Sequence, residues 1–158
     1  MKDNISKHIT YDEATFSGKA KELNISNTPN STQLTNMKLL AENIFEKARE
    51  HFDTPIYISS FFRSSKLNTK IKGSSTSQHC ANVGAAMDID ADVYKGVTNS
   101  DIFNYILENL NFDQLIWEFG NDENPDWVHV SYVSDILNRK EVLKAYKDKD
   151  NKTVYKKI

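Results

Sequence analysis

Two of the four histidines in the chain, His79 and His129, stand near acidic residues in segments typical of strands or strand edges. With Asp88 they form a set of two imidazoles and one carboxylate that neighbouring strands could bring together. Catalytic zinc usually takes three nitrogen or oxygen ligands from the protein and keeps a fourth position for water, whereas structural zinc fills all four positions, often with cysteines. Because Cys80 is the single cysteine, the pattern favours a catalytic metal. Spacing alone leaves another reading open, since strand histidines near acids are more often ordinary hydrogen-bonded residues.

Segments rich in β-branched and aromatic residues predict the strands that would carry these side chains. Residues 85–91 alternate between two faces, so that Ala86, Asp88 and Asp90 lie on one face of a strand. Further strands are predicted over residues 55–59, 113–119 and 127–132. A strand at 85–91 would therefore present its acids together on one side of a sheet.

Apolar residues at three- and four-residue spacing predict helices before and between the strands. The clearest helix covers residues 34–52, and Ser31 or Thr32 would accept the free N–H groups at its start. Thr98 or Asn99 would begin another helix. Weaker helical patterns cover residues 11–23 and 63–69. Helices come first and strands cluster later, so the sequence predicts an α+β fold with a mainly antiparallel sheet flanked by helices.

Length and composition indicate one compact domain. A chain of 158 residues with 39% hydrophobic residues can bury one core, so we assign residues 1–158 to a single domain, with a core from about 11 to 146 and a lysine-rich tail. The formal net charge of -2 gives no bulk attraction to nucleic acid or to an anionic membrane, and neither partner is expected. Residues 1–10 lack the apolar stretch of a secretory signal. We also expect a monomer.

The order of residues around the two histidines matches a known signature. Ser-x-His79 is followed by Gly84-x-Ala-x-Asp88, and later by Asp126-x-x-His129. This arrangement resembles the M15 family of zinc peptidases, which includes D-Ala-D-Ala carboxypeptidases, dipeptidases and phage L-alanyl-D-glutamate endolysins. The family usually has two residues between the first histidine and the glycine, and this chain has four. We place the two extra residues in the loop after His79 and keep His79 as a ligand.

The resemblance extends beyond this signature. The segment around Arg63 is similar to the arginine segment of the family, and the whole resemblance covers roughly residues 11–132. It implies the compact α+β fold that these peptidases share with the hedgehog signalling domain.

The resemblance also implies a role for each site residue. His79, Asp88 and His129 would bind zinc, and Asp126 would act as the general base that later passes a proton to the leaving amine. Arg63 would either hold the scissile carbonyl oxygen or bind a substrate carboxylate, and the sequence leaves both roles open. Further candidates for orienting a ligand histidine are Gln78, Asp90 and Glu118.

The function implied by the resemblance is zinc-dependent hydrolysis of peptidoglycan stem peptides, of the D-Ala-D-Ala carboxypeptidase or the L-Ala-D-Glu endopeptidase type. A non-catalytic, zinc-containing cell-wall binding module of the same fold is an alternative, and a zinc-free structural domain of a wall or virion assembly is a third. Without a signal sequence, the expectation is a phage lysin-like protein that is cytoplasmic until release and then acts at the bacterial cell wall.

Overall fold

A six-stranded sheet organises the computed structural model of the chain, which describes residues 3–158. The strands lie in the order β1-β2-β4-β3-β5-β6, and all neighbours are antiparallel except the parallel pair β3 and β5. Their bounds are β1 Tyr57–Ser60, β2 Ala85–Asp90, β3 Gln114–Glu118, β4 Trp127–Tyr132, β5 Glu141–Lys147 and β6 Thr153–Lys157. The prediction of an α+β domain with a mainly antiparallel sheet is confirmed.

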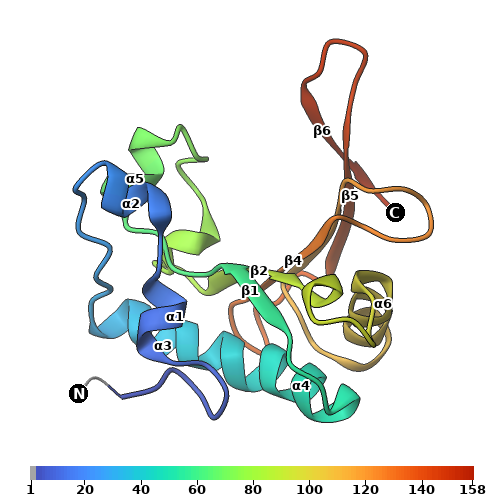
Figure 1. Cartoon of the computed structure of the whole chain (residues 1–158), viewed down its shortest axis with the longest axis horizontal. Coiled ribbons are helices and arrows are strands. Elements are labelled where there is room, and N and C mark those ends of the chain that lie inside the picture. The colour runs from blue at the N-terminus through green and yellow to red at the C-terminus, as the bar shows by residue number, and fades with distance from the viewer. Residues whose placement is uncertain (1–2) are drawn as a thin grey trace.

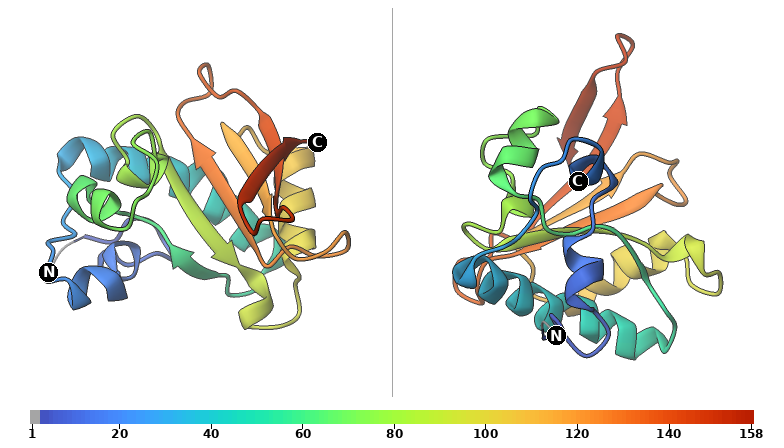
Figure 2. Two further views of the ribbon diagram at one scale, coloured as in Figure 1. Left: turned by 90° about the horizontal axis from the view of Figure 1, so that it is seen from above. Right: turned by 60° about the vertical axis from the view of Figure 1, so that its left-hand side comes forward.

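The helices cover one face of this sheet and one of its ends. Their bounds are α1 Tyr11–Thr15, α2 Gly18–Glu22, α3 Ser31–Leu40, α4 Glu46–Phe52, α5 Ser65–Lys70 and α6 Asn99–Asn109. Helix α3 contacts β2 and β4, and α6 contacts β3 and β4, so both pack on the same side of the sheet (Figures 1 and 2). Within residues 3–158, no helix is both long enough and apolar enough to cross a membrane.

The predicted helix over residues 34–52 is present as one continuous element, because α3 runs into α4 through the π-helical turn η1 (Ala41–Phe45). Its start differs from the prediction. Asn30, rather than Ser31 or Thr32, caps the helix: its side chain accepts from the backbone N–H of Gln33, and the Gln33 side chain accepts from the backbone N–H of Asn30. Ser31 is already helical, so its side chain lies past the capping position.

The other predicted helices are also present, with changes at their ends. The weak pattern over residues 11–23 forms two short helices, because Ser17 starts a new helix by accepting from the backbone N–H of Ala20. Thr98 caps α6 as predicted and forms a capping box with Asp101. The segment near Arg63 forms α5, which begins after Ser64.

The two faces of the sheet have different chemistry. Side chains toward α3, α4 and α6 are buried and apolar: Met87, Ile89, Leu115, Val128 and Val130. On the other face, Asp88 pairs with His129 across β2 and β4, and Glu118 pairs with Trp127 across β3 and β4. Because paired residues point to the same side of a sheet, the polar residues of three strands lie over one surface.

The C-terminal segment forms a hairpin that the sequence analysis did not predict. The lysine-rich residues 147–157 are expected from the sequence to form a solvated edge or a tail, whereas β5 and β6 extend the sheet beyond β3 and rise from the body of the molecule (Figure 1). Val142 of β5 packs against the apolar core, so the hairpin is joined to it. Lysines on an edge strand discourage pairing with another chain. A lysine-rich edge strand therefore resembles a solvated tail when only the sequence is considered.

Gly84 allows β2 to approach β4 closely at the start of their pairing. Its φ is +66°, and an added Cβ would collide with the backbone carbonyl of Tyr132. Gly96 has a φ of +98° and open space around it. Left-handed strain alone should make Gly96→Ala destabilising by about 1 kcal/mol, and the collision should make Gly84→Ala worse by a further 1–3 kcal/mol, roughly. Urea denaturation of both variants measures this difference, and equal losses would contradict it.

Candidate metal centre and catalytic cleft

A cleft of about 910 Å³ opens over the polar face of the sheet. One wall is the loop from Ser74 to Val83, and the other includes Leu143, Thr153 and Tyr155 of the C-terminal hairpin. The floor is formed by side chains that share one face of β2, β3 and β4: Asp88, Gln114, Ile116, Glu118, Trp127 and His129. Loop, sheet and hairpin therefore line one cleft.

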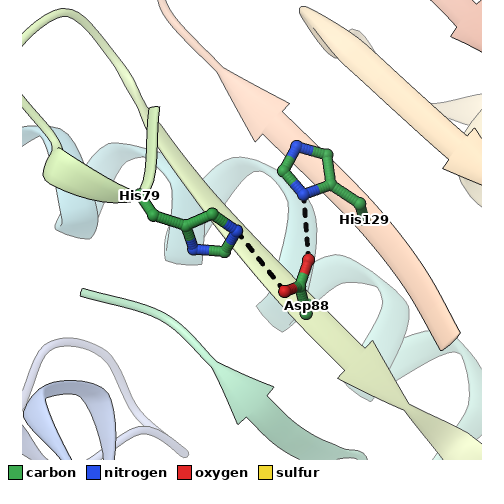
Figure 3. Close-up of side chains that lie close together, drawn as sticks. All are labelled: His79, Asp88 and His129. Carbon is green, nitrogen blue, oxygen red and sulfur yellow. Dashed lines mark hydrogen bonds and ion pairs between the residues drawn. The ribbon is translucent and has the colours of Figure 1, made fainter. Parts of the chain in front are cut away.

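The structure brings His79 of the loop wall together with Asp88 and His129 of the cleft floor (Figure 3). Their ligand atoms lie within 4.8 Å of one another. The Asp88 carboxylate lies between the two rings, 3.4 Å from His79 Nε2 and 2.9 Å from His129 Nδ1. Two imidazole nitrogens and one carboxylate oxygen, converging beside an open cleft, are a donor set that suits catalytic zinc.

A backbone contact holds His79 in a pose suited to a ligand. Its Nδ1–H donates to the carbonyl oxygen of Phe61 at 2.8 Å, which leaves the lone pair of Nε2 directed toward Asp88. His79 belongs to the short 3-10 turn η2 (Gln78–Cys80), which ends at Ala81 in a left-handed conformation with φ +55°. The longer spacing before Gly84 is therefore accommodated after the histidine, and His79 stays in the group.

The charge of Asp88 depends on its histidine neighbours. Burial alone would raise the pKa of this carboxyl group, but His79 and His129 outweigh that effect and hold the pKa below its usual range. Asp88 is therefore ionised at neutral pH, as a metal ligand must be.

Glu118 is the other carboxylate on the cleft floor. Glu118 is only 6% exposed. It lies two positions after Ile116, which pairs with His129, so Glu118 and His129 share one face of the sheet. Burial, followed by the negative charge of Asp88, raises the pKa of Glu118 to about 7. A carboxyl group with a pKa near neutral can both accept and release a proton at physiological pH, as a general acid–base catalyst must.

Asp126, the predicted general base, lies outside this group. It immediately precedes β4 and is exposed, and it does not line the cleft. Its backbone N–H donates to the carbonyl of Glu118, and its carbonyl accepts from the side chain of Asn99. His129 follows Asp126 by three positions, an odd offset that puts the two side chains on opposite faces of an extended segment.

Arg63, the other predicted catalytic residue, also has a different contact. Its Nη1 donates to Oδ1 of Asn68 at 3.2 Å, and its backbone N–H donates to the carbonyl of His79 at 2.9 Å. Arg63 is not among the residues that line the cleft. In this arrangement Arg63 supports the turn that carries His79.

The remaining candidates have structural contacts. The Asp90 carboxylate accepts from Asn99, and Gln78 donates to Asp113, so neither side chain orients a ligand histidine through these bonds. Cys80 is buried, and burial raises the pKa of its thiol, which opposes a role as nucleophile.

Two further residues that line the cleft, Arg139 and Tyr155, are not among the site residues predicted from the sequence. Arg139 makes a paired contact with the buried carboxylate of Asp113, through Nε at 2.9 Å and Nη2 at 2.7 Å. Both residues follow His129, where the signature ends, and therefore the signature does not predict them.

The comparisons with known proteins agree with this geometry. The family model described as Peptidase M15 matches residues 7–131, which is most of the chain. A search of curated proteins found no match. The matched segment includes the three candidate ligands and Glu118, and it ends before the C-terminal hairpin. By this match, the chain belongs to the peptidase M15 family.

Proposed function

We propose that this peptidase uses zinc, held by His79, Asp88 and His129, to hydrolyse peptidoglycan stem peptides, with Glu118 as the general base. The observation that carries the proposal is the cleft floor itself. Three suitable donor atoms lie within 4.8 Å of one another, and a buried carboxyl group with a pKa of about 7 faces the same cleft. A zinc ion bound there would supply Lewis acidity, lowering the pKa of water and polarising the scissile carbonyl.

Glu118 would carry the proton through the reaction. Its carboxylate removes a proton from the attacking water while the water oxygen forms a bond to the carbonyl carbon. Glu118 then gives the same proton to the amide nitrogen as the carbon–nitrogen bond breaks. The products are a carboxylic acid, which keeps the second proton of the water, and an amine, and Glu118 returns to its starting charge.

The cleft lining supports a polar peptide substrate. Serine and threonine residues of the loop from Ser74 to Ser77 form one wall, and the Arg139 side chain remains 54% exposed beside the floor. Stem peptides carry free carboxylates that an arginine can bind. The proposal includes both carboxypeptidase and endopeptidase activity. It also includes lysin-like action at the bacterial wall by a monomeric protein.

The alternative function is a zinc-containing wall-binding module without turnover. The environment of Glu118 argues against it, because keeping an ionised carboxylate buried near Asp88 opposes folding. A binding module has no need for such a group, whereas a hydrolase does.

Digestion of purified peptidoglycan tests the proposal. The zinc-loaded protein should release new termini that mass spectrometry identifies, and chelation followed by zinc addition should remove and restore the activity. The termini distinguish a carboxypeptidase from an endopeptidase. Stoichiometric zinc without cleavage would instead support the binding module, and cleavage that survives complete metal removal would exclude zinc catalysis.

The raised pKa of Glu118 predicts a pH-dependent stability difference in the metal-free protein. The pKa is about 7 in the folded chain against 4.5 for the ordinary group, so the folded state binds more protons between these values and stability falls as pH rises. Glu118→Gln should therefore raise the free energy of unfolding by about 2–3 kcal/mol at pH 8, with little gain at pH 4. Urea denaturation in EDTA measures the effect, with exposed Glu123→Gln as the control. A gain independent of pH would contradict this assignment.

A further inference from the structure

We propose that Tyr155, in the C-terminal hairpin, donates a hydrogen bond from its phenol O–H to the scissile carbonyl oxygen as negative charge develops there. This inference rests on the proposed peptidase function. It adds a catalytic residue from a segment beyond residue 131, where the family match ends.

The strand register places Tyr155 over the catalytic side of the sheet. Trp127 pairs with Glu118, Glu118 with Ala145, and Ala145 with Tyr155, so one row of residues crosses β4, β3, β5 and β6. Paired residues share a face, and therefore Tyr155 points to the same side as Glu118. Neighbouring strands are about 4.8 Å apart, and thus two strand spacings separate the backbones of Tyr155 and Glu118.

The residue between them leaves space for the phenol. Ala145 carries only a methyl group in the row, so the ring of Tyr155 can lean across β5 toward the cleft floor. Tyr155 lines the same cleft as His79, Asp88 and Glu118.

The electrostatic surroundings of Tyr155 keep its hydroxyl group protonated. Burial raises the pKa of Tyr155, and the charges of Glu118 and Asp88 raise it further. A phenol that keeps its proton is a hydrogen-bond donor throughout the neutral range. Such a donor stabilises an oxygen that becomes negative in the transition state, provided that it is held in place beforehand.

Both Arg63 and Arg139, which lie near the cleft, donate to partners within the protein. Arg63, predicted to hold either the carbonyl oxygen or a substrate carboxylate, donates to Asn68, and Arg139 donates to Asp113 through two nitrogens. Tyr155, by contrast, remains 53% exposed at the cleft wall, where a bound peptide would meet it. The hairpin therefore supplies the donor that the arginine segment does not place in the cleft.

The hairpin offers a matched control for the test. Tyr146 lies on β5 next to Ala145, points to the opposite face, and is 42% exposed. With the peptide bond that the wild type cuts as substrate, Tyr155→Phe should lower kcat by about 10²-fold and change KM little, the loss typical of one oxyanion donor. Tyr146→Phe should keep both constants, and both variants should keep the wild-type zinc content and melting temperature.

A binding measurement separates transition-state contact from other effects. A phosphinate analogue of the cleaved bond should lose affinity for Tyr155→Phe by a factor similar to the loss in kcat. An unchanged kcat, an equal loss in Tyr146→Phe, or a rise in KM alone would overturn the role of Tyr155 while leaving the peptidase intact. Absence of cleavage by the zinc-loaded wild type would overturn the proposed function and this inference with it.

Discussion

Glu118→Gln is expected to lower peptide hydrolysis by about 10²–10⁴-fold, whereas Asp126→Asn should keep most of the wild-type rate. Glutamine has nearly the shape of glutamate but cannot accept the proton of the attacking water. Asp126 is exposed and contacts Glu118 and Asn99 through its backbone, which the asparagine variant retains. The rate of terminus release from peptidoglycan, measured at equal zinc content, compares the two variants directly.

The reverse result would have a definite structural meaning. If Asp126→Asn were inactive and Glu118→Gln active, the segment before β4 would have to turn its carboxylate toward His129 during the reaction. The backbone bond from Asp126 N–H to the Glu118 carbonyl would then break. Unchanged activity in both variants would place the proton acceptor elsewhere in the cleft.

Glu118 and Asp126 show that a linear motif does not specify which face of a sheet a side chain lies on. The spacing Asp126-x-x-His129 matches the signature, but it does not state whether the aspartate belongs to the strand or to the preceding loop. In the structure, β4 begins at Trp127 and pairs with β3, so Glu118, distant along the chain, shares the face of His129. Choosing between the two acids requires the strand register, which the sequence analysis did not have.

Local patterns were sufficient where the chemistry is local. Alternation over residues 85–91 placed Asp88 on a face away from the core, and the helix of residues 34–52 followed from apolar spacing. The hairpin was missed because its stability comes from a distant contact: β5 pairs in parallel with β3, across an intervening strand in the chain. The wall that carries Tyr155 was therefore outside the range of local sequence patterns.

The direction of the Arg63 side chain could not be predicted from the sequence for a related reason. An arginine after a strand end can reach a substrate, a neighbouring turn or solvent, and the length of its side chain allows each of these. In the structure the Arg63 guanidinium donates to Asn68 of α5, while the Arg63 backbone N–H donates to the carbonyl of His79. Sequence placed Arg63 near the site, and packing decided which way it points.

Asp88→Asn is expected to reduce zinc affinity by more than about 10²-fold and to abolish hydrolysis at limiting zinc, since even residues that only support a ligand contribute 10–100-fold. The variant keeps the shape of the side chain but removes the negative charge between His79 and His129. Zinc titration with a competing chelator measures the affinity.

Asp90→Asn is the matched control for this loss. Asp90 lies two positions along the same face of β2, yet its carboxylate accepts from Asn99 instead of facing the histidines. An asparagine there keeps an acceptor oxygen, so zinc affinity and hydrolysis should both stay near the wild-type values. Equal loss in the two variants would mean that general negative charge on β2 attracts the metal. Loss confined to Asp88→Asn would instead identify direct coordination, because only this carboxylate lies between the two imidazoles.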